Sequence, residues 1–122
     1  MKSVRFAYVI FAVLVIAVLI NSLSVGKIID SISADITRAE ESDMAIAEKE
    51  YTEIYEKYKR YELYVSLSVD HEDLSNIEDA FSEIIGAARA DDAAGVVTTK
   101  SRLTDYLRHI KRLSGINIDS IF

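Results

Sequence analysis

Apolar side chains fill one stretch near the start of the chain and then recur on one face only of the stretches that follow. Phe6–Ile20 is an unbroken apolar run, preceded by Lys2 and Arg5. Extended to Val4–Val25, the run forms a helix of roughly 33 Å, long enough to cross a hydrocarbon core of about 30 Å. Two cations before the run favour a cytoplasmic N-terminus. The pattern predicts a single-pass cell-membrane protein whose following domain lies outside the cytoplasm.

The bulky side chains of this helix are expected to face lipid. They include Phe6, Tyr8, Phe11, Leu14 and Leu19.

A cleaved signal peptide is the alternative interpretation, with Ser22 and Ser24, or Ser24 and Gly26, as the small residues at the cleavage site. Helical spacing of apolar residues resumes at once, however, from Val25 through Ile32 to Ala39. Such spacing indicates that one helix continues out of the bilayer. We therefore divide the chain into a cytoplasmic stub and membrane anchor, residues 1–25, and an extracytoplasmic helical domain, residues 26–122.

Three further apolar stripes at helical spacing follow the anchor. The first begins at Met44 and runs to about Val69, the second covers Leu74–Ala88, and the third covers Val96–Ile110. The alternation from Leu63 to Val69 could also be read as a strand, but a lone strand would have no partner. The connections are short, and short connections join antiparallel helices. We predict an all-α fold, in which an N-terminal transmembrane helix continues into an antiparallel up-down bundle of three to four helices.

Polar residues mark the expected helix ends. Ser42 or Asp43 can cap the second helix, Asp70 the third, and Asp91 or Asp92 the fourth. Gly115 is expected just beyond the end of the fourth helix. The apolar tail that follows it, residues 116–122, is expected to pack back on the bundle.

Composition narrows the possible functions. The chain has no cysteine, so disulfides and thiolate metal sites are excluded. Beyond residue 26, 12 Lys and Arg residues face 20 Asp and Glu residues, a formal charge of −8. A domain with this charge should repel nucleic acid, so no nucleic-acid partner is expected.

The second helix carries an unusual number of tyrosines. At helical spacing such a stripe is more often core than contact surface, but it can also form a protein interface or line a ligand groove. We retain it as a possible interaction surface, made of Tyr51, Tyr55, Tyr58, Tyr61 and Tyr64.

The start of the third helix contains the acidic string Asp70-His71-Glu72-Asp73. Consecutive residues of a helix point in different directions, so this string is a better helix start than a metal site. We interpret Asp70, His71, Leu74 and Ile77 as a structural helix corner, with His71 available to hydrogen-bond a neighbouring helix. The sequence contains no constellation that specifies a reaction, so we expect no enzyme, no metal and no cofactor.

Two segments resemble a known family. The string His71-Glu72-Asp73-Leu74-Ser75-Asn76-Ile77-Glu78 and the ending Ile118-Asp119-Ser120-Ile121-Phe122, together with the basic start and anchor, resemble the domain of unknown function family DUF4363. The resemblance covers nearly the full chain. It implies a short, membrane-anchored helical protein of Gram-positive bacteria, with no established activity and no catalytic residues to carry over. Members often have a Trp in the second helix, a place that a Tyr would fill here.

These features favour a membrane-anchored, extracytoplasmic module that is a non-catalytic protein-interaction or structural component. Its expected partners are the lipid bilayer and either another membrane or extracytoplasmic protein or a second copy of the chain. The alternative is a sensor or small-ligand-binding domain that uses a Tyr-lined groove between helices.

Overall fold

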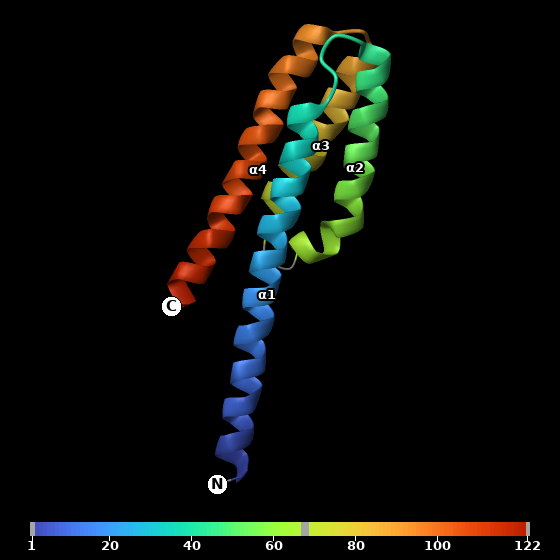
Figure 1. Cartoon of the computed structure of the whole chain (residues 1–122). Coiled ribbons are helices and arrows are strands. Elements are labelled where there is room, and N and C mark those ends of the chain that lie inside the picture. The colour runs from blue at the N-terminus through green and yellow to red at the C-terminus, as the bar shows by residue number, and fades with distance from the viewer. Residues whose placement is uncertain (1, 67–68, 122) are drawn as a thin grey trace.

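The computed structural model of the chain describes residues 2–66 and 69–121, which form four α-helices and no β-strand. The helices are α1 (Lys2–Arg38), α2 (Met44–Ser66), α3 (His71–Arg89) and α4 (Ala93–Ile121). Each helix packs against its neighbours in sequence, and α4 also packs against α1, which closes the bundle. Figure 1 shows neighbouring helices running in opposite directions. The predicted all-α, up-down bundle is confirmed.

The helix α1 has an uncovered N-terminal part and a C-terminal part that is packed in the bundle. It is unbroken over 37 residues, which corresponds to roughly 55 Å. Its N-terminal part extends alone beyond the bundle (Figure 1). Among the described residues, α1 is the helix that is long and apolar enough to cross a membrane. Val25 is the first fully buried residue among the described side chains of α1, so the bundle core begins where the predicted span ends. The prediction that one helix continues from the apolar run into the bundle is confirmed.

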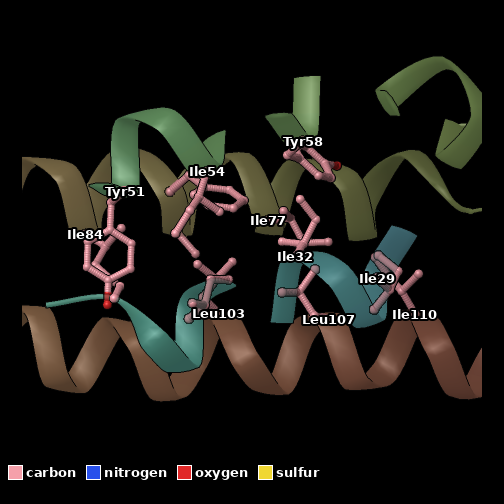
Figure 2. Close-up of a cluster of buried hydrophobic side chains, with 14 of the residues drawn as sticks. Ile29, Ile32, Tyr51, Ile54, Tyr58, Ile77, Ile84, Leu103, Leu107 and Ile110 are labelled. Carbon is pink, nitrogen blue, oxygen red and sulfur yellow. The ribbon is translucent and has the colours of Figure 1, made fainter. Parts of the chain in front are cut away.

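The core is a single cluster built from the predicted stripes. Each large apolar side chain removed from water contributes about 1.5–3 kcal/mol. Figure 2 shows side chains of all four helices meeting in this core: Ile29, Ile32, Tyr51, Ile54, Tyr58, Ile77, Ile84, Leu103, Leu107 and Ile110.

The helices α2 and α4 begin at the end of the bundle away from the N-terminus, and both are capped as the sequence predicts. The Oδ1 atom of Asp43 accepts the N–H groups of Ala45 and Ile46, at 3.1 and 3.3 Å, at the start of α2. The Oδ1 atom of Asp92 accepts the N–H of Gly95 at 3.0 Å, at the start of α4. These bonds satisfy N–H groups that the first helical turn leaves free. Asp70 occupies the N-cap position of α3, but its side chain makes no capping hydrogen bond.

One predicted helix end is wrong. The helix α4 does not stop before Gly115 but continues to Ile121. A lone glycine costs a helix only about 1 kcal/mol, too little to end one. Residues 116–121 therefore extend α4 instead of folding back on the bundle, and Phe122 lies outside the described residues. The helix α2 is described as far as Ser66. Residues 67 and 68 lie outside the described part, so the predicted end near Val69 stays a prediction.

Candidate functional site

The tyrosine stripe of α2 lies mostly in the core. Tyr51 and Tyr58 have no exposed surface. Tyr55 is half-buried and stacks on Phe81 of α3, with ring centroids 5.0 Å apart. Tyr61 is 38% exposed, and the side chain of Tyr64 lies outside the described part. Within the folded bundle Tyr51 and Tyr58 therefore cannot contact a partner.

The two buried tyrosines carry hydroxyl groups without hydrogen-bond partners among the described residues. Burial, reinforced by the charges of Glu41 and Glu50, raises the pKa of Tyr51 to about 12. Burial also raises the pKa of Tyr58, with Glu62 and Glu78 adding to the effect. Both hydroxyls stay neutral at physiological pH, and neither opens into a described cavity. They belong to the core and do not form a reactive site.

The predicted helix corner is held by apolar packing. Leu74 and Ile77 are buried, whereas His71 is exposed. Among the side chains that the structure describes, which leave out Tyr64, none on another helix forms a hydrogen bond with His71. The polar link from α4 to this corner comes instead from His109, whose Nε2 lies 3.8 Å from Oδ1 of Asp73.

A carboxyl pair joins α2 and α3 beside the corner. A hydrogen bond with Glu62 raises the pKa of Glu78, and partial burial and the negative charge of Glu62 act in the same direction. His71 and Lys59 oppose the shift only weakly. In the described residues no group of three or more His, Asp or Glu side chains is placed to hold a metal ion.

A charged cleft between α1 and α2 is the hollow that sequence reasoning missed. It has a volume of about 420 Å³ and is lined by Asp35, Arg38, Ala39, Glu50, Glu53, Ile54, Lys57 and Arg60. Lys57 Nζ donates to Asp35 Oδ2 and to Ser31 Oγ, both at 2.7 Å. The hydrogen bond from Lys57 lowers the pKa of Asp35, so this carboxylate stays charged. The groups accessible to a partner in this cleft are therefore charged side chains of both signs and not aromatic rings.

A smaller cavity lies nearer the uncovered part of α1. It measures about 190 Å³ and is lined by Lys27, Ile28, Ser31, Lys57 and Tyr61. Tyr61, unlike the buried Tyr51 and Tyr58, thus reaches a described hollow.

The expected lipid-facing residues lie on the uncovered part of α1. Phe6, Tyr8, Phe11 and Leu14 are 59–70% exposed, and Leu19 is partly exposed. A soluble protein rarely leaves such a continuous apolar surface in water.

Comparison with known proteins yields one match. The family model described as Domain of unknown function (DUF4363) matches residues 18–121. The match begins in the apolar part of α1 and takes in the whole of α2, α3 and α4. No curated protein matches the chain, and no solved structure matches it.

Proposed function

We propose that this chain, which belongs to the DUF4363 family, is a membrane-tethered, extracytoplasmic helical module that acts by contacting another protein or a second copy of itself. The observation that carries the proposal is the continuity of α1. Its N-terminal part presents an uncovered apolar surface, and the part from Val25 onward is built into the bundle core. An unbroken helix of this kind would hold the bundle at a fixed height above the bilayer.

The contact surface we propose is the charged cleft between α1 and α2. Arg60, Glu53 and Arg38 line it and are largely exposed. Mixed charges suit a complementary protein surface because they favour correctly oriented encounters and disfavour wrong partners. A non-catalytic role is consistent with the described titratable groups, since the strongly shifted ones are tyrosine hydroxyls sealed in the core.

The alternative function, a small-ligand sensor, would need a binding site other than the predicted Tyr-lined groove. Tyr51 and Tyr58 are core residues, so the ligand would have to occupy the charged cleft, whose volume of about 420 Å³ falls in the range of small-molecule sites. A small charged metabolite that raises the melting temperature of the wild-type chain, but not of a Glu53→Gln variant, would favour this reading.

Topology is tested by labelling single cysteines, because the native chain has none. Val97 is 53% exposed on α4, and Ser3 lies at the start of α1. In intact cells we expect a membrane-impermeant maleimide to label Val97→Cys but not Ser3→Cys, with both labelled after permeabilisation. The reverse pattern rejects the outward placement. Recovery of the chain from the soluble fraction without its first two dozen residues rejects the tether.

Contact through the cleft is tested with a photo-crosslinking amino acid at Glu53, and the same residue at Val97 serves as the matched control. We expect a discrete crosslinked product from position 53 only, at twice the mass if the partner is a second copy. Equal products from both positions would reject the cleft as the contact surface.

A further inference from the structure

The C-terminal part of α4 extends past the end of the bundle toward the anchor. The helix α2 ends at Ser66 and α3 begins at His71, whereas α4 continues to Ile121. Figure 1 shows the C-terminal end of α4 beyond the end of α2, level with the uncovered part of α1.

An ion pair sets the level of α4 relative to α1. Lys111 Nζ lies 2.6 Å from Asp30 Oδ1. The two helices are antiparallel, and both rise about 1.5 Å per residue. Counted from this pair, Ile116 is level with Val25, and Ile121 is level with Ile20. The last turns of α4 therefore reach the depth of the outer end of the apolar run.

The residues of α4 change character at this depth. Arg108 and Lys111, 62% and 53% exposed, and the exposed Arg112 lie near the level of Asp30. That level is roughly 7 Å outside Val25, the zone of lipid headgroups. Beyond them the sequence supplies Ile116, Ile118 and Ile121.

Polar residues in the same stretch limit how deep it can lie. Asn117 and Asp119 alternate with the isoleucines. At these levels α1 itself carries Asn21, Ser22 and Ser24. This composition fits the wet boundary between headgroups and acyl chains and does not fit the middle of the bilayer.

The end of α2 lies at nearly the same level. The hydrogen bonds of Lys57 to Ser31 and Asp35 fix the height of α2 on α1. Counted from these bonds, Leu63 is level with Lys27. Leu63 is 70% exposed, an unfavourable arrangement in water and a favourable one against lipid. The linkers at both ends of the bundle carry acidic residues, so the contact is limited to the cations of α4 and the exposed apolar side chains near the anchor.

We propose that the anchor-side end of the bundle is a membrane-contact surface, with Arg108, Lys111 and Arg112 among the phosphates and residues 116–121 of α4 at the acyl boundary beside α1. The inference rests on the proposed tether and adds a second contact to it. The domain then touches the bilayer at two places, so the bundle cannot swing freely about the anchor.

The absence of tryptophan from the chain makes a depth measurement direct. Single-Trp variants of the full chain, Ile121→Trp, Val97→Trp and Leu14→Trp, are reconstituted in phosphatidylcholine–phosphatidylglycerol vesicles whose acyl chains are brominated near the headgroup or near the chain end. We expect Ile121→Trp to be quenched more strongly by the shallow bromines. Leu14→Trp should be quenched more strongly by the deep ones. Val97→Trp, on the exposed distal part of α4, should be quenched by neither.

The controls separate this inference from the tether. If Leu14→Trp is quenched but neither Ile121→Trp nor a second reporter, Ile118→Trp, is, the membrane contact of α4 is rejected and the tether stands. If Leu14→Trp is not quenched either, the tether itself is rejected.

Discussion

Tyr58 places a hydroxyl group in the bundle core where no described side chain or backbone group bonds it. A buried hydroxyl without a partner costs about 1–3 kcal/mol relative to water. The ring itself packs well, with its centroid 5.6 Å from that of Phe81. We therefore expect Tyr58→Phe, which keeps the ring and removes the hydroxyl, to raise the free energy of unfolding by about 1 kcal/mol.

Urea unfolding of the full chain in detergent, followed by circular dichroism, measures this difference. Tyr61→Phe is the matched control, because Tyr61 is 38% exposed and its hydroxyl can reach water. A loss of stability in Tyr58→Phe would show that the hydroxyl has a partner that stabilises the fold.

The Glu62–Glu78 pair gives stability a defined dependence on pH. Because folding raises the pKa of Glu78, the protonated form is the one that folding favours. The favourable contribution is present below the ordinary glutamate pKa and is lost as the pH rises through the raised value. At neutral pH the two ionised carboxylates repel each other. Glu78→Gln should therefore raise the free energy of unfolding by about 0.3 kcal/mol, the scale of exposed like-charge pairs.

Unfolding curves at neutral and acid pH measure this effect. The gain of Glu78→Gln should shrink in acid, whereas Glu56→Gln, at an exposed position of α2, should show no comparable change. A gain that persists unchanged in acid would mean that the Glu62–Glu78 repulsion is not its cause.

Single residues were predictable as far as periodicity reports burial. The stripe that holds Tyr51 and Tyr58 was correctly placed on one face of a helix, with core packing as its commoner meaning. Sequence could not say which tyrosines are sealed, because that depends on contacts from distant segments, such as Phe81 against Tyr55. The corner role of His71 stays a prediction, and its ring makes no described bond to another helix.

At the scale of elements, the junction between α3 and α4 contains a residue with a strained backbone conformation. Asp91 has a φ of 57°, the left-handed region that costs most side chains about 1–2 kcal/mol. Asp91 N–H donates to Ala88 O at 3.1 Å, and Asp92 N–H donates to Ala87 O at 2.9 Å, which together form a Schellman end. Asp91→Gly should therefore raise the free energy of unfolding by about 0.5 kcal/mol.

A β-branched residue at the same position provides the comparison. Asp91→Val should lower the free energy of unfolding by about 1 kcal/mol or more, because its side chain is excluded from this region of φ. Both variants are measured by the same urea titration. Equal stabilities for glycine and valine would mean that the left-handed conformation is not retained.

Helix starts proved more predictable than helix ends. Asp43 and Asp92 cap their helices through bonds two or three residues away, a local chemistry that sequence records directly. Glycine is a common residue just beyond a helix end, yet α4 continues through Gly115. A glycine ends a helix only when the following chain gains by turning, and that gain depends on what surrounds the whole helix.

The candidate site belongs to the scale of the whole molecule, which explains why sequence reasoning missed it. The charged cleft forms where Asp35 of α1 meets Lys57 of α2, 22 residues further along the chain. Each helix alone shows only ordinary solvent-facing charges. Their meeting depends on the register of α1 and α2, which the core residues set. In the same way, the register of α4 on α1, marked by the Lys111–Asp30 ion pair, places the end of α4 level with the uncovered part of α1.

Because α1 is continuous, its length should control the height of the whole bundle. An insertion of eleven helix-forming residues containing Glu–Lys pairs, between Ser24 and Val25, adds about three turns and roughly 16 Å while nearly preserving the facing of both parts. The core from Val25 onward is unchanged, so the free energy of unfolding should stay within about 0.5 kcal/mol of the parent. The bundle should rise, and the last turns of α4 should leave the bilayer.

The Ile121→Trp reporter measures that rise. In the lengthened chain its quenching by shallow bromines should fall to the level of Val97→Trp, while the quenching of Leu14→Trp stays unchanged because the anchor is not moved. Retained quenching at residue 121 in a folded, lengthened chain would mean that α4 seeks the membrane independently of α1. In that case the bundle would be joined to its anchor by a bend, and the rigid coupling through α1 would be wrong.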